Sequence, residues 1–161
     1  MELKSQTEIK SSELLQIVSF RIANEEYGIN IQNVQEINRM VQITQVPNSP
    51  DFVEGVVNLR GNIIPIIELR KKLGLPRKEH DKNTRIIVAG VKDTTAGFIA
   101  DAVSEVLRIP QELLEAPPEI TAGVNSRYIK SVVKLENKLL ILIDLEKILT
   151  GKEEYELAET I

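Results

Sequence analysis

The chain has 161 residues, 20 Lys and Arg against 24 Asp and Glu, one histidine and no cysteine. Its length allows a sizeable hydrophobic core, while the lack of cysteine excludes disulfides, thiolate metal sites and a cysteine nucleophile. A net charge of -4, only 4% aromatic residues and no basic cluster argue against nucleic acid as a partner, and no apolar run approaches the roughly 20 residues that span a bilayer.

The pattern along the chain predicts a mainly β protein. The lack of cysteine fits a location in the cytoplasm, and without a long apolar run no insertion into a membrane is expected. Residues 1–13 are polar and of mixed charge, unlike a signal peptide, and are expected to form a flexible tail. Short β-rich segments separated by turn residues follow. Ten strands are expected, at residues 17–23, 27–31, 35–39, 53–59, 63–69, 85–91, 97–102, 105–108, 129–135 and 139–145.

Turn chemistry indicates that consecutive strands are antiparallel neighbours. Gly61-Asn62 and Asn137-Lys138 suit tight hairpins that need a positive φ. Pro65 cannot donate to a ladder, which predicts an edge strand or a bulge there. Short helices are expected at residues 70–73 and 146–149. Residues 152–161 either extend the final helix or form a solvated C-terminal tail, and the tail is the preferred interpretation.

The chain contains two similar halves. Tyr27-Gly28-Ile29 corresponds to Ala96-Gly97-Phe98 at an offset of 69, and residues 65–69 correspond to residues 141–145 at an offset of 76. The strand number alone fits barrels or a sandwich, and such short patterns also recur by chance in β proteins. A duplication would give two small barrels packed together, with the charged segment 75–83 as a solvated linker between the halves.

Catalytic motifs are missing from the sequence. It has no glycine-rich dinucleotide motif, no phosphate loop and no His-Glu-x-x-His, and His80 falls in the charged linker. A carboxylate pair for hydrolysis remains a weak alternative, although surface solubility explains such residues more simply. Its candidates are Glu36, Glu54, Glu68, Asp101 and Glu105. We therefore expect no enzyme activity, no cofactor and no metal.

Charged residues set among apolar strand residues are the more informative feature. Arg60 lies at a hairpin between two apolar strands, where its planar fork of donors suits a carboxylate at an interface. Glu36 is also placed among apolar residues. A structural alternative stays open, in which Arg60 pairs within the chain with Glu36 or Glu54 and the two glycines of the segment, Gly55 and Gly61, form only a bulge and a turn.

These segments resemble the CheW-type chemotaxis coupling proteins. The Asn-Leu-Arg-Gly hairpin of residues 58–61, followed by the Ile-Ile-Pro-Ile strand of residues 63–66, is the most specific feature. The resemblance runs from about Gln16 to Leu149. Its other segments are residues 25–31, 34–37, 55–70 and 139–149.

The resemblance implies a fold and a function. The fold is two five-stranded SH3-like barrels around a shared hydrophobic core, with short helices, in one domain of residues 14–151. The function is a non-catalytic scaffold that binds the regulatory domain of the chemotaxis histidine kinase and the cytoplasmic hairpin tip of chemoreceptors, and is recruited through them to membrane-associated arrays. A coupling domain of another signalling pathway would look alike, and gene neighbourhood would separate the two.

The resemblance also implies a set of binding residues. Glu36 and Arg60 match charged residues near the receptor contact, while Val34 and Ile37 would supply apolar surface beside them. Gly55 matches a glycine whose lack of bulk matters for docking. The full set implied for receptor or kinase binding is Val34, Glu36, Ile37, Gly55, Asn58, Arg60 and Gly61.

Overall fold

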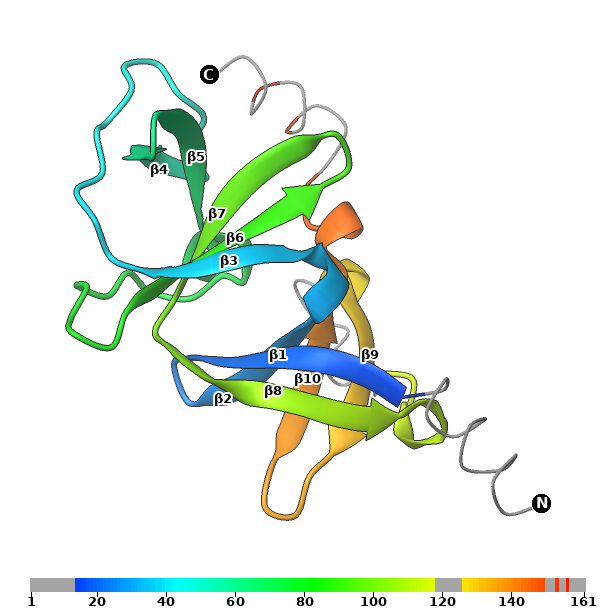
Figure 1. Ribbon diagram of the computed structural model, residues 1–161. Coiled ribbons are helices and arrows are strands. Elements are labelled where there is room, and N and C mark those ends of the chain that lie inside the picture. Colours follow the sequence, from blue (N-terminus) through cyan, green and yellow to red (C-terminus); the bar gives the residue numbers. More distant parts are fainter. Residues whose placement is uncertain (1–13, 118–125, 150–152, 154–155, 157–161) are drawn as a thin grey trace.

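The computed structural model describes residues 14–117 and 126–149, together with Glu153 and Glu156, and its strands form two five-stranded sheets (Figure 1). The mainly β fold is confirmed, and each of the ten predicted strands is present. Their bounds are β1 Leu14–Ile22, β2 Glu25–Asn30, β3 Val34–Arg39, β4 Val53–Leu59, β5 Asn62–Glu68, β6 Arg85–Val91, β7 Thr94–Ala100, β8 Ala102–Pro110, β9 Ile129–Lys134 and β10 Leu139–Ile143.

Helices in the described part of the chain are short. The predicted helix at residues 70–73 is α2, Leu69–Lys72, and the one predicted at 146–149 is a single 3-10 turn, η5, Leu145–Lys147. Further 3-10 turns are η1 Ile31–Asn33, η2 Gln111–Leu113 and η4 Ser126–Tyr128. Within the described residues no helix has the length and apolar character needed to cross a bilayer.

Each sheet is closed into a barrel by one pair of backbone hydrogen bonds. The first barrel has the strand order β8-β1-β2-β10-β9, and Glu115, beyond β8, exchanges two bonds of 2.9 Å with Val132 on β9. The second barrel has the order β3-β6-β7-β5-β4, and Thr44, beyond β3, exchanges bonds of 2.9 and 2.8 Å with Val56 on β4. The first and last strands of each sheet are therefore bridged.

The register of the two barrels repeats with the offsets seen in the sequence. In the second barrel the parallel pair β5–β7 sets Ile66 opposite Gly97, and in the first barrel the parallel pair β10–β2 sets Leu142 opposite Gly28. Each barrel combines two strands from one half of the chain with three from the other. The segment 75–83 joins β5 to β6, which both belong to the second barrel, so it connects the sequence halves but not the barrels.

Equivalent glycines allow equivalent strands to pack closely. A Cβ atom on Gly28 would lie 2.4 Å from Ile17 Cγ2 and 2.9 Å from Leu142 Cδ2. A Cβ atom on Gly97 would lie 2.8 Å from Ile86 Cγ2 and 2.6 Å from an Ile66 methyl group. Both barrels thus depend on a missing side chain at the same place in the register.

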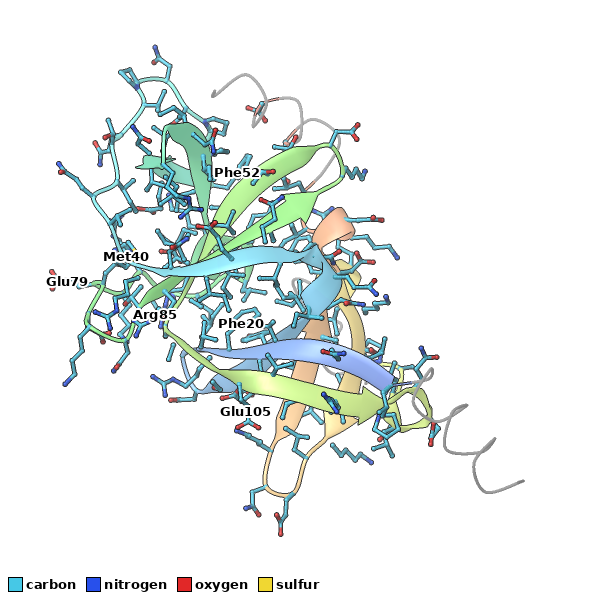
Figure 2. The ribbon with its side chains drawn as sticks, in the orientation of Figure 1. Phe20, Met40, Phe52, Glu79, Arg85 and Glu105 are labelled. Atoms are coloured by element: carbon cyan, nitrogen blue, oxygen red, sulfur yellow. The ribbon has the colours of Figure 1, made fainter. Side chains whose placement is uncertain are left out.

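The largest hydrophobic cluster is shared by the two barrels. Phe20 and Tyr27 come from the first barrel and Ile87 and Phe98 from the second, and all four are buried. Figure 2 shows Phe20 between the two sheets. A smaller cluster fills each barrel, around Ile17 and Leu140 in the first and around Ile66 and Ile86 in the second. The shared core implied by the family resemblance is present.

Two local predictions differ from the structure in part. Pro65 was expected at an edge or a bulge, and it lies in β5, an inner strand between β7 and β4. The β4–β5 register does shift nearby, between Val53 and Gly55. Pro65 is tolerated because its partner Val56 bonds to Thr44 instead, and because the parallel register with β7 begins one residue later, at Ile66. The hairpin loop between β4 and β5 is Arg60-Gly61 rather than Gly61-Asn62, since Asn62 pairs with Leu59 as the first residue of β5.

A candidate protein-docking surface

The β4–β5 hairpin ends in a rigid two-residue turn. Arg60 and Gly61 have φ values of 52° and 87°, the left-handed conformation that joins twisted antiparallel strands without splaying them. Asn58 Oδ1 accepts a hydrogen bond of 2.8 Å from the backbone N–H of Gly61. A non-glycine residue in this conformation is uncommon, so the turn holds Arg60 in a defined and outward position.

Arg60 bridges the turn to strand β3. Its Nη2 atom donates to Glu36 Oε2, and Asn38 Nδ2 donates to Glu36 Oε1. The side chains of Arg60 and Glu36 are 68% and 29% exposed, so the rest of the guanidinium fork faces solvent. The hydrogen bonds from Asn38 and then Arg60 lower the pKa of Glu36, which keeps this carboxylate charged at neutral pH.

The internal pairing left open by the sequence is therefore present, with Glu36 as the partner. Glu54, the other candidate, lies 3.5 Å from Arg77. An exposed ion pair of this kind is screened by solvent and contributes little to stability. Its pairing does not remove Arg60 from the surface, because the side chain stays mostly exposed.

Gly55 has an intramolecular explanation. It is buried, and the register between β4 and β5 shifts at this position, as expected of a bulge. Its φ is 153°, and an added Cβ atom would lie 2.4 Å from the carbonyl oxygen of Thr44, the residue that closes the second barrel. The lack of bulk at Gly55 thus serves barrel closure, and a partner could not touch this residue without first moving the chain around Thr44.

The apolar residues of the predicted set lie on the other face of β3 from Glu36. The register with β6 shifts between Val34 and Glu36, so Val34 and Ile37 pair with Ala89 and Ile87, both of the shared core, whereas Glu36 pairs with Val88. Val34 packs partly buried against the common core, and Ile37 is 40% exposed. Ile63 was not predicted, yet it is 46% exposed and lies directly across the hairpin from Asn58.

These observations define what we call the hairpin surface: Glu36, Asn38, Asn58, Arg60, Gly61 and Ile63. It combines a fixed ion pair with exposed apolar area, as protein interfaces do. Of the predicted residues, Val34, Ile37 and Gly55 lie outside it. Asn38 and Ile63 were missed, although Asn38, two residues beyond Glu36, could have been placed on its face by strand alternation.

Two of the carboxylates considered for catalysis, Glu68 and Asp101, have structural partners. Arg70 donates from Nη2 to Asp101 Oδ2 at 2.6 Å and from Nε to Oδ1 at 3.3 Å, and its backbone N–H donates to Glu68 at 3.2 Å. Burial raises the pKa of Glu68. Burial also acts to raise the pKa of Asp101, but hydrogen bonds from Arg70 and the Ala23 N–H outweigh it, and the pKa is lowered.

This buried cluster joins the two barrels. Asp101 stands between β7 and β8, and it binds the turn of the first barrel through Ala23 and the helix of the second barrel through Arg70. His80 Nε2 lies 3.9 Å from Glu68 Oε2. Among residues 14–117 and 126–149, Glu153 and Glu156, no group of three or more His, Asp or Glu side chains could hold a metal ion.

The chain matches known proteins over most of its length. The model of the CheW-like domain family matches residues 16–153. A chemotaxis protein CheW of Klebsiella aerogenes is 41% identical over 134 residues, which cover 83% of this chain and 81% of that protein. A chemotaxis protein CheW of Helicobacter pylori is 39% identical over 139 residues, or 86% of this chain and 84% of that protein.

A solved structure agrees with the fold. The crystal structure of the scaffolding protein TtCheW from Thermoanaerobacter tengcongensis superposes with a TM-score of 0.79 at 36% sequence identity. The match covers 87% of this chain and 90% of that one.

Proposed function

The chain belongs to the CheW-like family, and on that premise we propose that it is a non-catalytic scaffold that couples chemoreceptors to the chemotaxis histidine kinase. One partner would be the regulatory domain of the kinase and the other the cytoplasmic hairpin tip of a receptor. The scaffold would act in the cytoplasm and reach membrane-associated arrays through these partners.

The observation that best supports a docking role is the geometry of Arg60. The residue is fixed by a strained turn and by Glu36, yet 68% of its side chain is exposed. A preorganised arginine with exposed apolar area beside it is a common centre of interface binding energy, because little conformational freedom is lost on binding. The stability of the unbound protein does not explain this arrangement, because exposed ion pairs contribute little to folding.

Coupling in this proposal follows from two docking faces on one rigid body. A receptor that changes state can alter the kinase only if the complex with the scaffold has a different free energy in the two states. The shared core and the Arg70–Asp101 pair connect the barrels and would transmit such a difference.

The test is titration calorimetry of the full chain against the purified kinase regulatory domain of the same organism, and against a receptor cytoplasmic fragment. Wild type, Arg60→Asp and a control, Arg39→Asp, would first be shown to be folded by circular dichroism. Arg39 is an exposed arginine at the end of the same strand as Glu36. Its replacement by aspartate therefore changes the net charge by the same amount as Arg60→Asp.

We expect wild type to bind both partners and Arg60→Asp to lose about tenfold or more in affinity for one of them, while Arg39→Asp retains both. The partner that is lost identifies the face on which Arg60 lies. A folded wild type that binds neither partner would overturn the proposed function. Equal losses in both variants would assign the effect to overall charge and remove Arg60 from the docking site.

A further inference from the structure

Lys72 holds a buried ammonium group at the junction of the two barrels. The residue lies in α2, and its side chain is 7% exposed. Its Nζ atom lies 5.3 Å from the ring centroid of Phe52 and 5.5 Å from that of Tyr128. Phe52 precedes β4 of the second barrel, where Figure 2 labels it, while Tyr128 ends η4 and leads into β9 of the first barrel.

The charge of Lys72 is balanced by a residue from the end of the chain. Both carboxylate oxygens of Glu153 accept from Lys72 Nζ, at 2.6 and 2.7 Å. Two aromatic faces offset part of the cost of removing an ammonium group from water, and the carboxylate offsets a larger part. Glu153 therefore departs from the interpretation of residues 152–161 as a solvated tail.

A second cation lies beside the same ring. Arg127 Nη2 donates to the Tyr128 hydroxyl at 2.9 Å, and its Cζ atom lies 4.9 Å from the ring centroid. Arg127 and Lys72 thus flank Tyr128 and create a local positive potential. Phe52 and Tyr128 are 7% and 4% exposed and belong to the shared core, so the site is anchored in both barrels.

We propose that Lys72, Arg127, Phe52 and Tyr128 form a carboxylate-binding site whose ligand is Glu153 of the same chain, and that this contact fastens Glu153 at the junction of the barrels. The ligand class is a single carboxylate on a peptide, held by charge from Lys72 and framed by aromatic rings. The proposal is independent of the partners proposed above, because each contact in it lies within one chain.

Hydrogen–deuterium exchange on the full-length chain tests this site. Glu153→Gln removes the charge of the ligand and keeps its size, and Lys72→Met removes the ammonium group and keeps an apolar stem. The matched control is Lys71→Met, which removes the neighbouring lysine on α2. Lys71 pairs with Asp51 at 3.0 Å, and its side chain is 40% exposed.

We expect amides of peptides from residues 150–161 to exchange about tenfold faster in Glu153→Gln and in Lys72→Met, with Lys71→Met unchanged. Unchanged exchange in both Glu153→Gln and Lys72→Met would overturn the proposal. So would equal acceleration in Lys71→Met, since the effect would then come from the net charge of α2. If Lys72→Met also accelerates exchange in β4, that variant has loosened the core. The result for Glu153→Gln alone then tests the proposal.

Discussion

The two barrels repeat one backbone plan but differ at the turn that carries the hairpin surface. With the offsets of 69 and 76, Glu36 of the second barrel corresponds to Glu105 of the first, and Arg60 corresponds to Glu136. The second barrel therefore has an ion pair between its hairpin and β3, whereas the same positions of the first barrel carry two like charges. The duplicated framework is retained while the candidate docking surface occurs on one copy only.

The interiors of the barrels differ at one further pair of equivalent positions. Gly55 of the second barrel corresponds to Ser131 of the first. Around Gly55 the space is filled by Ile43 and the backbone of Thr44. Beside Ser131 the first barrel keeps a cavity of about 50 Å³, lined in part by Ile17, Leu114 and Leu142. The second barrel is thus tightly closed where the first is loosely packed.

The largest expected effect comes from filling the tight position. Gly55→Ala should lower the free energy of unfolding by about 3 kcal/mol, because the new Cβ meets the Thr44 carbonyl and the positive φ disfavours any side chain. Urea titration followed by circular dichroism measures this difference. Ser131→Ala, at the equivalent position, is the control and should change stability by less than about 1 kcal/mol. Equal costs at the two positions would show that the barrels do not differ in packing.

Adding apolar volume at Ser131 should increase the stability of the protein. The buried Ser131 hydroxyl has no hydrogen-bond partner among the residues that the structure describes. Ser131→Val removes this polar group and adds apolar volume beside the cavity, so we expect a gain of about 1 kcal/mol in urea titrations. A loss of stability would mean that the hydroxyl is bonded in solution and that the cavity is hydrated.

The helix caps offer a smaller, pH-dependent contrast. Glu68 caps α2 and the equivalent Asp144 caps η5, but Glu68 is 3% exposed and Asp144 is only half-buried. Burial raises the pKa of Glu68 above its ordinary value of 4.5, despite the hydrogen bond from the Arg70 N–H and the charge of Arg70. His80, Glu54 and Asp101 also face this carboxyl group.

The raised pKa of Glu68 determines how this residue affects stability at different pH values. At a pH above the pKa of the folded state, Glu68 is ionised while buried, which lowers the free energy of unfolding. This loss of stability disappears as the pH falls towards 4.5, because Glu68 is then protonated in the folded state. Glu68→Gln should therefore be more stable than wild type at pH 7, and the advantage should shrink on acidification. Thermal unfolding between pH 4.5 and 7 measures this, with Asp144→Asn as the matched control. An advantage independent of pH would contradict the expectation.

The smallest effect concerns the missing ion pair of the first barrel. Glu136→Arg sets an arginine at the position that corresponds to Arg60, with Glu105 at the position that corresponds to Glu36. We expect a gain in stability of a few tenths of a kcal/mol, as for other exposed pairs, and none at 1 M salt. Kinase or receptor binding should stay unchanged, because Ile63 and Asn58 correspond to Leu139 and Lys134 in the first barrel. Enhanced binding would mean that the charge alone makes the docking surface.

Local structure was largely predictable from the sequence. Strands such as β4 and β6 were placed with their correct bounds because apolar alternation and turn residues act over a few neighbouring residues. The Arg60–Glu36 pair was anticipated as one of two alternatives. Sequence could not choose between Glu36 and Glu54, since both are carboxylates in strands and only the closed barrel brings one of them to the turn.

Features that depend on strands far apart in sequence were not predictable. For Pro65 the edge alternative was wrong, because the sequence does not show that Val56 bonds to Thr44 instead. The sequence also does not show that the chain around Thr44, eleven residues earlier, covers Gly55. The repeat identified equivalent strands, but it could not show that each barrel combines strands from both halves.

That combination sets an order for synthesis on the ribosome. The strands of the second barrel run without interruption from Val34 to Ala100, whereas those of the first barrel come from residues 14–30 and 102–143. The second barrel can close as soon as β7 has left the ribosome. The β1–β2 hairpin is synthesised first, but its edges stay unpaired until β8, β9 and β10 have been synthesised. The barrel that begins first in the chain is therefore the last to be completed, and the turn at Arg60 is in place before it.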